Sequence, residues 1–318
     1  MKFSRRFCLI TAALALPALA GRAHALELEW VTVENPGNKP DKTGYGAVAY
    51  PYQISRFEVT VAQYAEFLNA VAAKGDPHAL WNANLGSALL TDNNQGGIRK
   101  DLPVFIDRIG APGAYRYQVL PGTEKKPVLF AGFLEAMRFA NWLHNGQGQG
   151  DTENGAYHIA KHGGLAVHEP DARVWIPTED EWYKAAYHHP EAKGGPAGGY
   201  WLYPVRSNEK PRTPAAGDAM ANAANFSRSY VDAWPVGSYP NAASFYGTFD
   251  QGGNAWEWNE AIVFGTQRGL RGGCMAHTVE KLRSSVRSHA HPAKRYPDTG
   301  FRLARPAPKI EPAAEKQP

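Results

Sequence analysis

The sequence predicts one α+β domain with little regular secondary structure, spanning residues 26–305. Only three stretches have the apolar spacing of a helix. Between them lie short apolar runs, interrupted repeatedly by turn-forming residues that include 32 glycines and 24 prolines. No internal repeat and no linker divides the chain. A few helices, many short strands and much irregular chain are typical of the α+β class.

The first two expected elements follow one another directly. Residues 52–59 alternate between apolar and polar side chains, which predicts a strand with one buried face. Thr60 then occupies the position of a helix N-cap, and Gln63 three residues later completes a capping-box pattern. Apolar side chains recur at helical spacing as far as Val71. We therefore expect a strand followed by a helix.

Two further helices are expected in the middle of the chain. Residues 129–143 return to helical spacing, and Asn145 followed by a glycine marks the end of this helix. Thr178 and Glu181 form a second capping-box pattern, which opens a third helix. Pro190 sets the limit of that helix, because proline cannot continue a helical hydrogen-bond pattern.

Two regions are expected to be irregular. Residues 77–121 are rich in glycine, asparagine and aspartate, so we expect surface loops around one short strand near residues 104–106. Residues 199–246 combine turn residues with many aromatic side chains, which predicts short strands and loops. The aromatic residues expected to pack this region are Trp201, Tyr203, Phe226, Trp234 and Tyr239.

The N-terminus is typical of a secretory signal, with cleavage expected after Ala25. A basic start precedes an apolar run of about thirteen residues, and small residues follow. The alternative, a membrane anchor, is disfavoured because the run contains Pro17 and is shorter than the roughly twenty residues that span a bilayer. Arg5 and Arg6 also fit twin-arginine export. We expect a periplasmic or secreted protein with no membrane span after cleavage.

The charge balance bears on nucleic-acid binding, and the composition of the C-terminal end bears on its order. The 34 basic and 30 acidic residues are interspersed and give a net charge of only +4, so the composition does not indicate nucleic-acid binding. Residues 306–318 contain four prolines and few apolar side chains. Such a segment cannot bury enough apolar surface to order itself, which predicts a disordered tail.

One acidic segment has the spacing of a calcium site. Asp250 and Glu257 flank the backbone carbonyls of Gly253 and Ala255 in a glycine-bearing turn. Carboxylate and carbonyl oxygens at this spacing suit a hard cation such as Ca²⁺. The alternative is an ordinary turn with solvated acids.

Four short motifs recur in a fixed order: I-P-T-E-D-E-W at residues 176–182, D-Q-G-G-N-A-W-E-W at 250–258, R-G-G at 271–273 and T-G-F-R at 299–302. Together they resemble the formylglycine-generating enzyme (sulfatase-modifying factor) family, whose members carry R-L-P-T-E-A-E-W, G-N-V-W-E-W, R-G-G-S-W and G-F-R. The resemblance covers roughly residues 28–305. It implies a fold related to C-type lectins, with structural calcium held at the acidic segment described above.

The resemblance also implies positions for the substrate groove. Trp256 and Trp258 correspond to tryptophans near the floor of the groove in the family, and Arg287 is a further candidate for its lining. The alternative for the two tryptophans is a role as core anchors, since aromatic residues dominate core burial. Arg302 matches the arginine of the G-F-R motif, which is expected to be structural.

Cysteine content sets this chain apart from the family's oxidases. Cys8 lies in the signal, so Cys274 is the only thiol of the mature chain and no intrachain disulfide can form. The oxidases hold Cu(I) between two cysteines five residues apart, and this composition excludes such a site. Cys274 and His277, with His289 and His291, supply soft and imidazole ligands suited to copper or zinc. The alternative is that Cys274 is a packed, inert thiol.

Three functions remain open from the sequence. The first is a divergent oxidative modification or maturation factor that acts on a peptide, protein or small molecule. The second is a non-catalytic, calcium-stabilised binding module that uses the lectin-like groove. The third is formylglycine generation on a sulfatase with an altered metal site. Relatives that join cysteine to histidine derivatives carry an iron-binding H-x3-H-x-E helix in an added domain, and that pattern is absent from this sequence.

Overall fold

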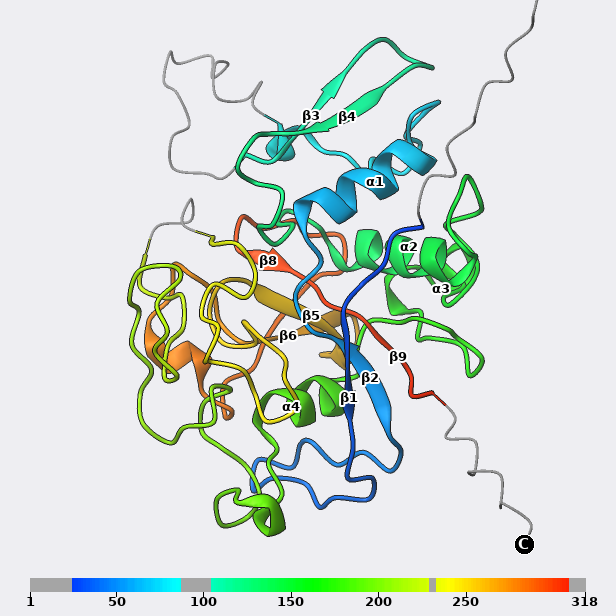
Figure 1. The fold of residues 1–318 in the computed structure, drawn as a ribbon. Helices are drawn as coiled ribbons and strands as arrows, with labels where there is room; N and C mark the ends of the chain where they lie inside the picture. The colour runs from blue at the N-terminus through cyan, green and yellow to red at the C-terminus, as the bar shows by residue number, and fades with distance from the viewer. Residues whose placement is uncertain (1–24, 87–103, 229–232, 309–318) are drawn as a thin grey trace, which may run out of the picture.

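The computed structural model describes residues 25–86, 104–228 and 233–308, in which the chain forms four α-helices and three small sheets (Figure 1). None of the helices in these residues is long and apolar enough to cross a membrane. Most of the predicted signal and tail, and part of the predicted 77–121 loop region, lie outside the described residues. The helices are α1 (Val61–Val71), α2 (Phe133–His144), α3 (Ile159–His162) and α4 (Glu179–Tyr187).

The sheets mix antiparallel and parallel pairing. One sheet has the order β1-β2-β9, a hairpin pairs β3 with β4, and a third sheet has the order β7-β6-β5-β8. Only β5 and β8 run parallel among these neighbours. The combination of few helices and small sheets confirms the predicted α+β class. The strands are β1 (Trp30–Val33), β2 (Tyr52–Ser55), β3 (Ile106–Ile109), β4 (Arg116–Val119), β5 (Trp256–Val263), β6 (Gln267–Arg271), β7 (Ser288–Ala290), β8 (Thr299–Gly300) and β9 (Ala304–Pro306).

The capping boxes predicted for two helices are present. The Thr60 hydroxyl accepts a hydrogen bond from the Gln63 backbone N–H, and the Gln63 side chain accepts one from the Thr60 backbone N–H. Thr178 and Glu181 make the same reciprocal pair at the start of α4. Both helices begin at the residue after the cap, because these bonds satisfy backbone donors that a helix leaves unpaired.

Two of the predicted elements have different limits. Helix α2 begins at Phe133, four residues after the predicted start, because Phe130 adopts a left-handed φ of 57° and its backbone N–H donates to the Tyr296 carbonyl. Strand β2 ends at Ser55, and all four of its residues are buried. The predicted single buried face was wrong: Tyr52 and Ile54 pack into the core, and Gln53 on the other face is covered by hydrogen bonds to the side chains of Thr32 and Arg305 on the flanking strands.

Two irregular regions also differ from the prediction. The short strand expected near residues 104–106 is a hairpin of two strands, β3 and β4. Residues 199–228 and 233–246 form no named strand and contain only isolated bridges, so the short strands predicted there are wrong. The aromatic packing is confirmed in part, since Tyr203, Phe226 and Tyr239 are buried in one cluster with Trp234 against it.

The four-stranded sheet lies near the centre of the molecule, and three of the four sequence motifs overlap its strands β5, β6 and β8. Figure 1 shows β5 and β6 between α2 and α4. Trp258 on β5 is fully buried and packs edge-on against Phe133 of α2, with ring centroids 5.9 Å apart. On the other side, the Trp182 indole of α4 donates to Glu257 of β5 at 2.7 Å. Strand β5 is therefore held between α2 on one side and α4 on the other.

Candidate functional site

Three metal-ligating side chains meet at the end of this sheet. The ligand atoms of Cys274, His277 and Asp298 all lie within 4.8 Å of one another. The Cys274 Sγ is 3.3 Å from His277 Nδ1 and 3.6 Å from Asp298 Oδ2. Cys274 is fully buried, whereas the other two side chains are partly exposed. We refer to these three residues as the Cys-His-Asp cluster.

Glycine geometry places Cys274 after β6. Gly272 and Gly273 adopt φ values of 100° and 75°, which side-chain-bearing residues rarely reach. A Cβ on Gly273 would lie 3.0 Å from the Leu282 side chain and 3.1 Å from the Lys281 backbone. The two glycines turn the chain sharply inward, and the His277 backbone N–H then donates to the Cys274 carbonyl at 3.2 Å. This turn brings the imidazole back beside the thiol.

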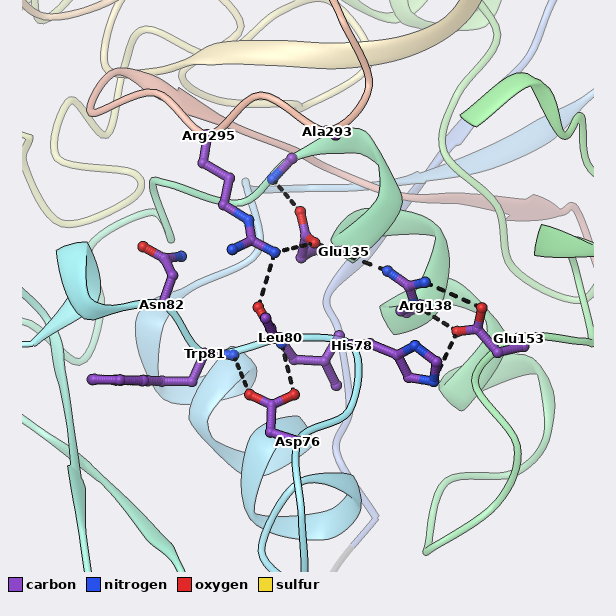
Figure 2. Close-up of polar contacts among 12 residues, drawn as sticks. Asp76, His78, Leu80, Trp81, Asn82, Glu135, Arg138, Glu153, Ala293 and Arg295 are labelled. Carbon is purple, nitrogen blue, oxygen red and sulfur yellow. Dashed lines mark hydrogen bonds and ion pairs between the residues drawn. The ribbon is translucent and has the colours of Figure 1, made fainter. Parts of the chain in front are cut away.

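Strand pairing and a polar network place Asp298. Its carbonyl accepts the Trp256 backbone N–H at 2.8 Å, directly before the parallel pairing of β8 with β5. Arg295, three residues earlier, donates to Glu135 at 2.6 Å and to the Ala79 carbonyl at 2.9 Å (Figure 2). The segment that carries Asp298 is therefore held between β5 and the start of α2.

Figure 2 shows that this network continues along α2. Glu135 is 2% exposed, and its other oxygen accepts the Gly132 backbone N–H. One turn further, Arg138 forms a two-point ion pair with Glu153, whose carboxylate is also 3.4 Å from His78. Planar guanidinium–carboxylate pairs of this kind are strong and directional. The bond from Arg295 to Glu135 holds the loop that precedes Asp298, whereas the Arg138–Glu153 pair ties α2 to residue 153.

Burial and one hydrogen bond decide where the protons of Cys274 and His277 lie. Burial, with a smaller contribution from the Asp298 charge, raises the pKa of Cys274, so the metal-free thiol keeps its proton. The Trp256 indole N–H donates to His277 Nδ1 at 2.9 Å. Because an indole nitrogen can only donate, Nδ1 carries the lone pair and a neutral His277 carries its proton on Nε2. That is the tautomer in which Nδ1 can ligate a metal.

The donor set fits a single transition-metal ion. One sulfur, one nitrogen and one carboxylate oxygen match the three protein ligands of catalytic zinc sites and are also suited to copper. A metal at this position would require loss of the Cys274 proton and release of the Trp256 hydrogen bond, and both groups border the same space. The cluster leaves the remaining coordination positions to solvent or substrate.

The other histidines considered from the sequence do not join the cluster. His289 is exposed on β7, where its Nδ1 contacts the Gln267 side chain, and His291 is exposed in the loop beyond it. His158 and His162 have the H-x3-H spacing at α3, but Gly164 stands where the glutamate of the iron-binding pattern would be. Within the described residues, no other three histidine, cysteine, aspartate or glutamate side chains bring their ligand atoms within 4.8 Å of one another.

The expected groove residues are not brought together. Trp256 is 5% exposed and contacts the cluster through its indole, whereas Trp258 is fully buried and donates to the Ala131 carbonyl. Arg287 forms a two-point ion pair with Glu179 at the start of α4, at 2.8 and 2.7 Å. Of the three, only Trp256 touches the candidate site. Trp258 instead has the alternative role considered from the sequence, that of a buried core residue.

The predicted calcium residues lie beside a buried arginine. Both oxygens of Glu257 accept hydrogen bonds from Arg302, at 2.6 and 2.8 Å, and both residues have no exposed surface. Asp250 accepts the Gly237 backbone N–H at 2.6 Å, and burial raises its pKa to about 6. A calcium ion would therefore use Asp250 with the carbonyls of Gly253 and Ala255, and would share Glu257 with Arg302.

A third carboxylate, not foreseen from the sequence, belongs to this group. Glu58 is 1% exposed, and its Oε1 has no hydrogen-bond partner among the described residues. Burial and the nearby charges of Asp250 and Glu257 raise its pKa.

Asp298, in the Cys-His-Asp cluster, was also not predicted from the sequence, because no spacing rule links it to Cys274. The only signal for Asp298 is an acid placed directly before the T-G-F-R motif.

Comparisons with known proteins agree with the motifs. A profile of the sulfatase-modifying factor enzyme 1-like domain matches residues 37–307. A hercynine oxygenase of Mycolicibacterium smegmatis is 27% identical over 277 residues, which cover 80% of this chain and 52% of that protein. One from Mycobacterium tuberculosis is 30% identical over 148 residues, covering 41% of this chain and 32% of that protein. The chain spans about half the length of the first of these curated relatives.

Solved structures agree on the fold. The crystal structure of CarF superposes with a TM-score of 0.53 at 19% identity and covers 89% of this chain and 99% of that chain. Treponema denticola variable protein 1 superposes with a TM-score of 0.50 at 18% identity, covering 87% of this chain and 95% of that chain. At these identities the likeness establishes the fold and not the activity.

Proposed function

The chain belongs to the sulfatase-modifying factor enzyme 1-like family, and we propose that it is an oxidative modification enzyme or maturation factor with one redox metal at the Cys-His-Asp cluster. Its substrate is a peptide, protein or small molecule. The observation that carries the proposal is the convergence of a thiol, an imidazole and a carboxylate within 4.8 Å. The resemblance to oxygenases in sequence supports the oxidative class.

Each residue of the cluster has a distinct part in holding the metal. Cys274 supplies the soft ligand, and Asp298 Oδ2, at 3.6 Å, can accept the thiol proton, because the nearer His277 Nδ1 already accepts the Trp256 indole N–H. His277 supplies Nδ1, already in the required tautomer. Bound copper supplies one-electron exchange with dioxygen, which zinc cannot supply. Burial of Cys274 limits access of other oxidants to the thiolate.

Metal content tests this proposal and separates the alternatives. The purified mature chain, loaded with copper and desalted, should retain about one copper ion, measured by mass spectrometry of metals. Cys274→Ser, His277→Ala and Asp298→Asn should each lower copper affinity by more than the roughly 10- to 100-fold typical of outer-shell substitutions, because each removes a ligand. His289→Ala is the matched control, since this histidine is exposed and outside the cluster.

Three outcomes would contradict the proposal. Retention of zinc but not copper would leave the cluster without redox chemistry. Retention of neither would favour the non-catalytic binding module, which needs only calcium. Copper lost equally in His289→Ala would place the metal elsewhere. Oxidation of a sulfatase peptide by the copper-loaded chain would identify formylglycine generation as the specific reaction.

We also propose that the protein is exported, because the basic and apolar N-terminal residues and the small residues before Leu26 form a signal segment. The Leu26 backbone is held at both its N–H and its carbonyl by the Gln147 side chain, at 2.8 and 2.9 Å. Leu26, the expected first residue of the mature chain, is thus hydrogen-bonded to the folded part of the protein. Mass spectrometry of the mature protein should show Leu26 at the N-terminus, whereas Met1 retained in a cytoplasmic fraction would contradict export.

A further inference from the structure

A cavity of about 850 Å³ lies on a different part of the molecule from the Cys-His-Asp cluster. It is formed by β2 with the residues before it, by the loop from His168 to Trp175, and by the end of β9. None of its lining residues belongs to the cluster or to the predicted calcium set. We call it the aromatic cavity, because Tyr50, Tyr52 and Trp175 form much of its wall.

The three aromatic rings are oriented by one buried residue. Tyr50 and Trp175 donate to the two carboxylate oxygens of Glu181, each at 3.0 Å, and Tyr52 donates to the Glu181 backbone carbonyl at 2.5 Å. The rings of Tyr50 and Tyr52 stand edge to face, with centroids 6.3 Å apart and planes at 72°. These hydrogen bonds hold the polar ends of the rings toward Glu181, while all three side chains line the cavity. The face of an aromatic ring is its electron-rich part.

The charges around the aromatic cavity are predominantly negative. Glu34 stands at its rim, where Lys193 is a distant partner at 3.8 Å, and no lysine or arginine lines the wall. Glu181 is fully buried and makes no ion pair among the described residues. Burial raises the pKa of Glu181, but its polar contacts are all donors, which satisfy the ionised form. A cation in the cavity would favour the ionised form of Glu181.

His168 adds a second buried carboxylate behind the wall. Its Nδ1 donates to Glu260 at 2.8 Å, and its ring stacks on Trp175 with centroids 4.8 Å apart. Tyr157 also donates to Glu260 at 2.5 Å. A protonated His168 is therefore neutralised by Glu260 and adds no net positive charge to the cavity wall.

We propose that the aromatic cavity is a binding site for a small organic cation. Aromatic faces attract cations through their quadrupoles, and the effect is strongest where water is excluded. Tyrosine and tryptophan rings that donate hydrogen bonds to carboxylates are richer in electron density, and Glu34 supplies a full charge at the rim. An anionic ligand would meet no fixed cation other than the paired His168.

The test compares a cation with its uncharged carbon analogue. Choline and 3,3-dimethylbutan-1-ol have nearly the same shape, and isothermal titration of the mature full chain measures the affinity of each. A cation–π contribution of about 0.5–2 kcal/mol predicts that choline binds roughly 2- to 30-fold more tightly. Equal affinities, or no choline binding at any soluble concentration, would overturn the proposal.

Substitutions locate the binding. Tyr50→Ala and Glu34→Gln should each weaken choline binding several-fold, while Tyr50→Phe, which keeps the ring but loses the bond to Glu181, should weaken it less than Tyr50→Ala does. Tyr50 is 46% exposed, so these changes should leave the fold intact, which thermal melting checks. Phe264→Ala is the matched control, an 80% exposed aromatic outside the cavity. Choline binding unaffected by Tyr50→Ala would contradict this site, and Cys274→Ser should leave it unchanged.

Discussion

Replacing Arg302 with methionine should lower the free energy of unfolding by about 3–5 kcal/mol, because it leaves the buried Glu257 without its counter-charge. Arg302 has no exposed surface, and its guanidinium binds both oxygens of Glu257. It also donates to the carbonyls of Ser55, Arg56 and Phe249 at 2.7 to 3.2 Å. Methionine fills similar volume but satisfies none of these acceptors. Urea denaturation measures the change, provided that the slope with denaturant is unaltered.

Two further variants separate charge from packing. Adding Glu257→Gln to Arg302→Met removes the unpaired charge, so the double variant should be more stable than Arg302→Met alone. Arg305→Met is the matched control, because this arginine is only partly buried and makes a single hydrogen bond to Gln53. Its loss should cost about 1 kcal/mol or less. A loss in Arg302→Met no larger than in Arg305→Met would show that the ion pair contributes little.

Local signals in the sequence predicted local structure well. The Thr60 and Thr178 capping boxes fixed the starts of α1 and α4, because a cap involves residues only three positions apart. The start of α2 was misplaced, since the Phe130 backbone N–H donates a hydrogen bond to the Tyr296 carbonyl, in a loop more than 160 residues away. Burial of the second face of β2 was also unpredictable, because Arg305, one of the two side chains that cover Gln53 there, is about 250 residues away in the sequence.

The candidate site shows the same limit. Cys274 and His277 are close in sequence, and their three-residue spacing was visible as a ligand pattern. Asp298 joins them only because β8 pairs in parallel with β5 and two glycines turn the chain after β6. Neither pairing nor turn direction can be inferred from ligand spacing. Likewise, nothing local connects Glu58 with the acidic segment at Asp250.

These buried carboxylates bear on the calcium proposal. Glu58, Asp250 and Glu257 place three carboxyl groups around one guanidinium, that of Arg302. Ionised carboxylates in excess of cations are costly to bury, so either protons or a metal ion must compensate them. Calcium at Asp250 and the carbonyls of Gly253 and Ala255 would supply the missing positive charge. It would also account for the retention of an acid at each end of this turn.

Removing calcium should therefore destabilise the folded protein. A ligand that binds only the native state adds about 3 kcal/mol at a free concentration one hundred times its dissociation constant. A chelator should lower the melting temperature accordingly, and added calcium should restore it. Asp250→Ala should melt near the temperature of the chelated protein and should no longer respond to the chelator. Asp171→Ala, at an exposed aspartate, is the matched control and should respond as the unsubstituted chain does. A melting curve that chelation leaves unchanged, with metal removal verified, would show that protons rather than calcium neutralise the buried carboxylates.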